Sequence, residues 1–244
     1  MMRILVANAN TTEAITQLCA AAARDAAAPG TEIVPATPRF GPAVISSRAE
    51  NIIAGHALLE LLAGHSGQVQ AVVLAVSHDT ALEAARQLMP CPVVGMTEAA
   101  CLTACMVAAR FGLLTLGGVE TYRELIGRHG LSSRLSGLDG VAMTPQEAVR
   151  DPAGAEAAVL AGIHRLVEGG ADAVVLGGAA LAGMAARLAD RSPVPLLDGI
   201  ACAVKQAEAL VALNLPKPRA GSLAPLSGRD SSGLSAELAA MLKG

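Results

Sequence analysis

An internal repeat is the feature that most restricts the fold of this chain of 244 residues. Residues 71–101 read AVVLAVSHDTALEAARQLMPCPVVGMTEAAC, and residues 173–202 read AVVLGGAALAGMAARLADRSPVPLLDGIAC. Both begin with AVVL, continue with Ala-Ala-Arg, and end with a Pro-led apolar run before Ala and Cys. A weaker similarity joins the segments that start at Arg3 and Arg110. The chain up to about residue 213 is therefore predicted to be a duplication.

Each copy alternates apolar runs with longer Ala-rich segments of helical period. The predicted strands are ILVA, AVVLAV, PVVGM, FGLLTL, AVVLGG and PVPLL. Strands this apolar are typical of a parallel sheet that helices cover on both faces. We therefore predict an α/β fold with two pseudo-symmetric, Rossmann-like parallel-sheet halves and the active-site cleft between them. The expected boundaries are 1–108, whose last helix is a candidate for swapping across, 109–213, and a Pro/Gly/Ser-rich arm at 214–244 with a short terminal helix.

Composition excludes several classes of function. The net charge is −3, and the Lys and Arg residues are scattered, which argues against nucleic acid as a partner. Mean hydropathy is +0.48, but no run approaches the about 18 apolar residues that a membrane span needs. No secretory signal follows Met1, so we expect a cytoplasmic protein. The five cysteines lack metal-type spacing, so neither a metal nor a cofactor is expected, and the low charge of this Ala-rich chain favours a homo-oligomer.

Polar residues directly follow the first predicted strand. Asn8, Asn10 and Thr11 lie between the ILVA strand and an Ala-rich helix. Ligands of parallel sheets bind beyond the carboxyl ends of the strands, and amides and hydroxyls beside free backbone N–H groups suit a carboxylate or an imide carbonyl. We predict that these three residues bind the substrate, a small carboxylate or ureide. The alternative is that Thr11 or Thr12 only caps the helix.

The strand ends of the second half offer a different set of groups. Thr115, near the end of the FGLLTL strand, is the predicted opposite contact to the substrate. Gly177, Gly178 and Ala179 end or follow the AVVLGG strand. Because glycine has no Cβ, this segment can bring backbone N–H groups close to a ligand. The sequence thus predicts an anion-binding backbone in the second half.

Several segments together resemble the hydantoin and allantoin racemases of the aspartate/glutamate racemase superfamily. They are NANTT (8–12), which is similar to the family's N-P-N-T-T, AAPGTEIV (27–34), PVVGMTEAA (92–100) and DGIACAVK (198–205). The segments occur in the family's order across residues 3–213. The resemblance implies the two-half α/β fold and a proton exchange at an acidic carbon, performed by one cysteine from each half. It also places Arg48 in a variable cleft loop, where it would pair a substrate carboxylate; exposure on the surface is the alternative.

Both cysteines that the resemblance implies are absent. The family pattern A-C-F-x-D-P-G-L corresponds here to AVSHDTAL from Ala75, so Val76 stands at the first position. The pattern V-L-G-C-A-G corresponds to VLGGAA from Val175, so Gly178 stands at the second. The five cysteines of the chain lie elsewhere, at positions 19, 91, 101, 105 and 202. The resemblance therefore implies the fold but not symmetrical two-thiol racemisation.

Ser77 and His78 follow Val76 directly and are the candidate catalytic residues in place of the thiol. A histidine titrates near neutral pH and can act as a general acid or base; the alternative is a loop histidine bonded to backbone or water. Asp79 is expected to cap a turn or helix. Val76 and Thr80 are expected to line the substrate-binding site.

Two classes of function remain open. One is a hydantoin-racemase-like isomerase or lyase that acts at an acidic carbon without the usual two cysteines. The other is a non-catalytic protein that binds a small anion or ureide.

Overall fold

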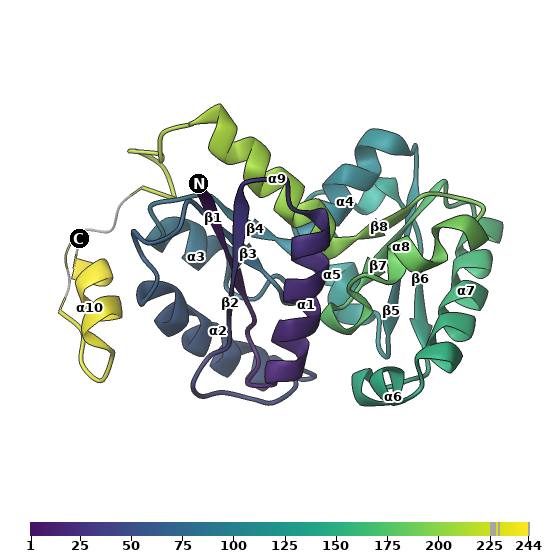
Figure 1. Ribbon diagram of the computed structural model, residues 1–244, viewed down its shortest axis with the longest axis horizontal. Helices are drawn as coiled ribbons and strands as arrows, with labels where there is room; N and C mark the ends of the chain where they lie inside the picture. Colours follow the sequence, from purple (N-terminus) through teal and green to yellow (C-terminus); the bar gives the residue numbers. More distant parts are fainter. Residues whose placement is uncertain (225–227, 229, 244) are drawn as a thin grey trace. The chain divides into compact units, whose positions relative to one another are not determined.

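The computed structural model describes residues 1–224, 228 and 230–243. The chain forms two compact units (Figure 1): unit 1 is Met1–Gly95 with Val204–Gly244, and unit 2 is Met96–Ala203. Each unit has a four-stranded parallel sheet flanked by helices. The predicted α/β class with parallel sheets is thereby confirmed. Where the two halves of the duplication meet stays a prediction, and so does a cleft between them.

The sheet of unit 1 has the strand order β2-β1-β3-β4. Its strands are β1 (Met2–Ala7), β2 (Thr31–Ala36), β3 (Ala71–Leu74) and β4 (Val93–Gly95). Its helices are α1 (Glu13–Ala26), α2 (Arg48–Ala63), α3 (Leu82–Leu88), the part of α9 (Gly199–Leu213) from Val204 onward, and α10 (Ala236–Lys243). The last of these is the predicted terminal helix, while residues 225–227, 229 and 244 of the predicted arm lie outside the described residues.

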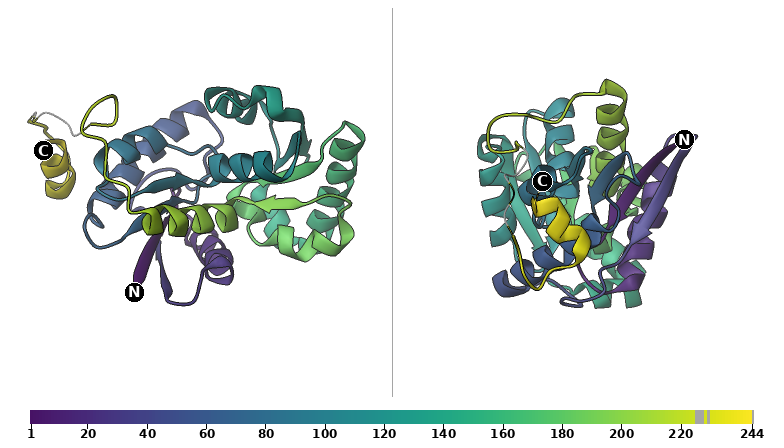
Figure 2. Two further views of the ribbon diagram at one scale, coloured as in Figure 1. Left: turned by 90° about the horizontal axis from the view of Figure 1, so that it is seen from above. Right: turned by 90° about the vertical axis from the view of Figure 1, so that its left-hand side faces the viewer.

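Helices cover both faces of this sheet. Figure 2 shows α1 on one face and α2 with α3 on the other, as right-handed crossovers require for this strand order. Leu58 and Leu62 of α2 and Leu82 of α3 pack in one cluster with Leu5 and Leu74 of the central strands. The burial of these side chains stabilises the sheet and leaves the strand ends as the places open to polar groups.

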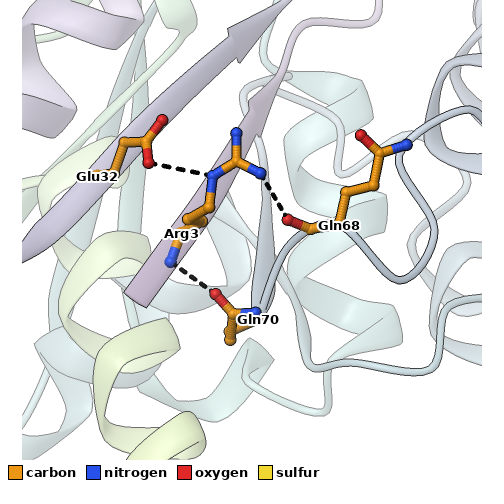
Figure 3. Close-up of polar contacts among 4 residues, drawn as sticks. All are labelled: Arg3, Glu32, Gln68 and Gln70. Atoms are coloured by element: carbon orange, nitrogen blue, oxygen red, sulfur yellow. Dashed lines mark hydrogen bonds and ion pairs between the residues drawn. The ribbon is translucent and has the colours of Figure 1, made fainter. Parts of the chain in front are cut away.

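The amino-terminal edge of this sheet is held by Arg3 (Figure 3). Its Nε donates to Glu32 Oε2 at 3.1 Å and its Nη1 to the Gln68 carbonyl at 2.9 Å, while its backbone N–H donates to Gln70 Oε1 at 2.8 Å. The ion pair is about 40% exposed, so it contributes at most about 1 kcal/mol. These contacts join β1 to β2 and to the start of β3, at the end opposite the predicted ligand-binding edge.

The sheet of unit 2 has the order β6-β5-β7-β8, which repeats the order of unit 1. Its strands are β5 (Phe111–Leu116), β6 (Leu135–Val141), β7 (Ala173–Gly177) and β8 (Leu196–Asp198). Its α-helices are α4 (Met96–Val107), α5 (Glu120–Arg128), α6 (Pro145–Arg150), α7 (Pro152–Glu168), α8 (Met184–Leu188) and the first residues of α9 (Gly199–Leu213). Single 3-10 turns span Ser132–Arg134, Ala179–Leu181 and Ala189–Arg191.

The register of the two sheets shows which positions correspond. In unit 1 Leu74 of β3 pairs with Gly95 of β4. In unit 2 Leu176 of β7 pairs with Asp198 of β8. Because the AVVL segments of β3 and β7 match residue by residue, Gly95 and Asp198 occupy equivalent positions at the carboxyl ends of the two edge strands. None of the described helices is both long and apolar enough to cross a membrane.

Candidate functional site

The loop after β1 is organised by Asn8. Its side chain is completely buried, and its Nδ2 donates to Asn10 Oδ1 at 2.9 Å and Thr16 Oγ1 at 3.0 Å. Its Oδ1 accepts the backbone N–H of Asn10 at 3.1 Å. Asn10 Oδ1 in turn accepts the Thr12 N–H at 2.9 Å. The Asn8 amide is thus occupied within the loop, and the geometry supports a role in shaping the loop.

The same loop also contains two side-chain donors, Asn10 Nδ2 and Thr11 Oγ1. Asn10 Nδ2 and Thr11 Oγ1 make no hydrogen bond to any of the described residues; the bonds of Asn10 and Thr11 use their other atoms. Both residues are half-buried. Thr12 stands at the N-cap of α1, but its side chain makes no cap bond; its hydroxyl donates to the Ala43 carbonyl at 2.7 Å. The alternative in which the Thr12 hydroxyl caps the helix is therefore wrong, and the first turn of α1 begins without a side-chain acceptor.

The turn after β3 contains the candidate catalytic residues. Val76 is 5% exposed, and Ser77 and His78 are half-buried. Thr80 is buried, and its hydroxyl donates to Asn51 Oδ1 of α2 at 2.6 Å. β1 and β3 are neighbouring strands, so this turn and the Asn8–Thr12 loop leave the same edge of the unit 1 sheet.

Asp79 is the buried titratable residue of this turn. Its residue is 4% exposed, and its φ of 47° lies in the left-handed region. A methyl group built on Gly95 would lie 2.5 Å from the Asp79 Cγ, so the carboxyl group fills the space beside the end of β4. Ala81, and not Asp79, is the N-cap of α3, and it makes no side-chain cap bond. Asp79 is therefore not the N-cap residue of α3, while the alternative in which it caps a turn stays a prediction.

Arg48 is exposed at the first position of α2. Helix α2 begins with a capping box, in which Ser47 Oγ accepts the Glu50 N–H and Glu50 accepts the Ser47 N–H. Hydrogen bonds from Ser46 and Ser47 lower the pKa of the Glu50 carboxyl. The exposure of Arg48 agrees with the surface alternative, while a contact with substrate stays a prediction.

The ends of β5 and β7 in unit 2 carry a buried threonine and small residues. Thr115 is 2% exposed, and its hydroxyl makes only a long contact of 3.5 Å with the Leu116 carbonyl. Gly177 is packed against Tyr122, whose Cε1 would lie 3.0 Å from an added methyl group. Gly178 has φ 131°, where side chains are strained, and Ala179 begins a 3-10 turn.

A carboxylate orders the neighbouring edge of the unit 2 sheet. Asp198 Oδ1 accepts the N–H groups of Ile200 at 2.8 Å and Ala201 at 3.0 Å, and so caps α9. Its Oδ2 accepts the Gly183 N–H at 2.6 Å. The Asp198 carboxyl group therefore joins the start of α9 to the turn after β7.

The cysteines are poor proton carriers where the structure places them. Burial raises the pKa of the Cys91 thiol to about 11 and that of Cys202 to about 11, so both stay protonated near neutral pH. Cys19 and Cys101 are buried on helices α1 and α4. Within the described residues, no group of three or more His, Cys, Asp or Glu side chains is arranged to hold a metal ion.

Comparison with known proteins identifies the family. A family model described as Asp/Glu/Hydantoin racemase matches residues 4–207. This chain belongs to the Asp/Glu/hydantoin racemase family. A hydantoin racemase of Pseudomonas sp. (strain NS671) is 36% identical over 216 residues, which covers 87% of this chain and 87% of that protein.

Two solved structures support the same assignment. An allantoin racemase from Klebsiella pneumoniae is 37% identical, with a TM-score of 0.92 over 98% of this chain and 99% of its own. An allantoin racemase from Pseudomonas fluorescens is 31% identical, with a TM-score of 0.91 over 95% of this chain and 100% of its own. The resemblance predicted from the sequence is confirmed.

Sequence reasoning predicted Asn8 as a substrate ligand, and that role stays a prediction; the structure adds that its amide is hydrogen-bonded within the loop and to Thr16. Sequence reasoning gave Gly95 no role, although this glycine borders a buried carboxyl group. A glycine at the end of an apolar strand, where its repeat partner has Asp198, is the signal that could have revealed it.

Proposed function

We propose that this chain is a racemase-type isomerase that acts at the acidic carbon of a cyclic ureide or a related small carboxylate, without a pair of thiols. Family membership supports the reaction type. The relatives named hydantoin racemase and allantoin racemase support the substrate class, because both compounds are cyclic ureides with a C–H bond beside a carbonyl.

The observation that decides the chemistry is the pair of residues after β3 and β7. Val76 is apolar and buried, and Gly178 has no side chain. Neither can accept a proton. His78 is the titratable side chain closest in sequence to Val76 that is also half-buried, and imidazoles in general titrate near neutral pH. We therefore assign proton transfer to His78, with Ser77 beside it.

The mechanism uses groups at one edge of the unit 1 sheet. The His78 imidazole takes the proton from the acidic carbon, and the electron pair of the C–H bond moves onto the carbonyl oxygen. In this proposal Asn10 Nδ2 and Thr11 Oγ1 donate to the resulting enolate oxygen and stabilise it, and the start of α1, which lacks a side-chain cap, favours its negative charge. Return of the proton to the carbon completes the exchange, so electrons and protons balance within the substrate and the imidazole.

The backbone of unit 2 supplies a complementary function in this proposal. Thr115, Gly177, Gly178 and Ala179 would bind the substrate without moving a proton. With a base on one face only, the proton returns mainly to the face it left. We expect exchange with solvent to be faster than inversion of configuration.

The test is exchange in heavy water. The separate enantiomers of 5-substituted hydantoins and of allantoin are incubated with the protein, and deuterium at the acidic carbon is followed by NMR beside optical rotation. The expected result is deuterium uptake faster than loss of rotation, both above the rate without protein. His78→Gln should abolish the uptake, and Asn10→Ala should weaken it. Uptake that survives His78→Gln would exclude this role of His78.

A binding protein is the second candidate function. The buried Val76 and the glycine backbone after β7 support it, because neither can transfer a proton and both are compatible with binding alone. In that case the same compounds raise the melting temperature of the protein, while deuterium uptake stays at the rate without protein. Carbon dioxide released from small amino-dicarboxylates would instead indicate the lyase reaction.

Self-association and a cytoplasmic location stay predictions. Exposed apolar side chains on one face of α4 favour self-association: Leu102 is 42% exposed and Met106 85%. Sedimentation equilibrium of the protein and of Met106→Glu measures this directly, and a monomer in both samples would contradict it.

A further inference from the structure

The turn after β3 is held in an unusual conformation. Asp79 has φ 47° and Ala81 has φ 57°, and in the described part of the chain Asn214 is the one other non-glycine residue with a positive φ. Such residues persist where the surroundings enforce them, and they concentrate at functional sites. Something must therefore hold this turn.

Bonds within the turn and to α2 fix two of its sides. The Asp79 N–H donates to the Val76 carbonyl, and the Leu82 N–H donates to the Asp79 carbonyl, both at 3.1 Å. Thr80 is joined to Asn51 of α2 at 2.6 Å. The third side of the turn faces β4, and the Asp79 carboxyl group lies on that side.

Gly95 forms the wall for this carboxyl group. A methyl group at residue 95 would lie 2.5 Å from both Cγ and Oδ1 of Asp79 and 2.9 Å from its Oδ2. These separations are far below van der Waals contact, so a side chain at residue 95 and the present position of the Asp79 carboxyl group exclude each other.

Unit 2 makes a related contact between the same two segments. Asp198 occupies the position equivalent to Gly95. Its Oδ2 reaches back to the N–H of Gly183 at 2.6 Å, in the turn that follows β7, and Gly183 has φ 78°. In each unit one carboxylate and one glycine connect the turn after the third strand with the end of the fourth. The carboxylate comes from the turn in unit 1 and from the strand in unit 2.

We propose that Asp79 is a positioning residue: its carboxyl group, seated against Gly95, holds the turn in the conformation that presents Ser77 and His78. The catalytic consequence rests on the proposed function, because it requires His78 to be the base. The connection between Asp79 and Gly95 does not rest on it, and the two can be tested separately.

The first test is a double-mutant cycle on melting temperature. Gly95→Ala should lower it by several degrees, because the methyl group displaces the carboxyl group. In an Asp79→Gly background the three atoms nearest to this methyl group are gone, so adding Gly95→Ala should change the melting temperature much less. Gly118→Ala is the matched control: this glycine has no atom within 4 Å of an added methyl group and no positive φ. Equal effects of Gly95→Ala in both backgrounds would overturn the proposal.

The second test reads the orientation of His78 directly. The imidazole signals of 15N-histidine-labelled protein are recorded at one pH and assigned with His78→Gln. Gly95→Ala and Asp79→Gly should both shift the His78 signals, while Asp79→Asn, which keeps the shape of the side chain, should restore them largely. Unchanged His78 signals in Gly95→Ala would overturn the positioning role, even if the protein is destabilised.

Deuterium exchange into hydantoin then connects the turn with catalysis. Displacement of the turn should lower kcat by up to about a hundredfold, with a smaller change in KM, because Asn10 and Thr11 remain in place. If the unmodified protein shows no exchange, the proposed function fails while the melting and NMR results still decide the role of Asp79. If exchange occurs but Gly95→Ala exchanges at the unmodified rate, the positioning role fails while the proposed function stands.

Discussion

The two units share a sheet and differ where their strands end. In unit 1 the loop after β1 is a network of side-chain bonds centred on the buried Asn8. In unit 2 β5 ends in a threonine whose hydroxyl makes only a long contact among the described residues, β7 ends in glycines 177 and 178, and the one side-chain network described at this edge is that of Asp198. The two units thus keep the same strand order while the side chains at their carboxyl-terminal edges differ.

The largest expected effect comes from the centre of the unit 1 network. Asn8→Ala removes a buried amide, so the Asn10 N–H and the Thr16 hydroxyl lose their hydrogen bonds to Asn8. We expect the free energy of unfolding to fall by about 2–3 kcal/mol. Thr115→Val, the matched change in unit 2, should cost less than about 1 kcal/mol, because its hydroxyl makes no short bond. Urea denaturation measures both. Similar losses in the two variants would remove the contrast between the units.

A thiol placed at each of the two strand ends should be tolerated unequally. Gly178→Cys puts a side chain at φ 131° and should cost about 1–3 kcal/mol in backbone strain. Val76→Cys keeps an ordinary negative φ and loses roughly one buried methylene, about 0.8 kcal/mol. Thermal unfolding of the two variants compares them. A Gly178→Cys protein as stable as the unmodified chain would show that unit 2 does not depend on glycine there.

The smallest expected effect is a pH dependence in unit 1. Burial raises the pKa of Glu208, but hydrogen bonds from the Ala28 N–H and the Thr31 hydroxyl outweigh it, and the pKa is lowered overall. The resulting stability is present above the unfolded pKa of about 4.3 and is lost as pH falls through the lower folded value.

Glu208→Gln should remove this dependence at a cost below about 1 kcal/mol at pH 7. Amide hydrogen exchange of the α1–β2 connection at pH 3.5 and pH 7 measures it. A pH dependence that persists unchanged in Glu208→Gln would assign it to another carboxylate.

The sequence predicted six of the eight described strands and missed the two edge strands β2 and β6. β1, β3, β5 and β7 are continuous apolar runs, because helices cover both faces of a central strand. β2 and β6 read TEIVPA and LSGLDGV and are mostly half-buried. Proline, glycine and mixed polarity occur in these edge strands because an edge has fewer partners to satisfy, and these residues hide the strand pattern.

The candidate site was predictable in position and not in conformation. Parallel topology alone locates the Asn8–Thr12 loop and the turn at residues 76–81, since ligands bind beyond the carboxyl ends of strands. Which amide of two asparagines is occupied depends on side-chain geometry that spacing does not encode. The left-handed φ of Asp79 and Ala81 could not be predicted from the sequence either, because neither residue type favours a positive φ as glycine does.

The φ of Gly178 limits where a proton-transferring side chain can be introduced. At position 76 the backbone already carries a side chain, so a thiol requires one substitution and no change of path. At position 178 any side chain strains the turn after β7. A designer who wants a second proton carrier in unit 2 should therefore place it at a position other than Gly178.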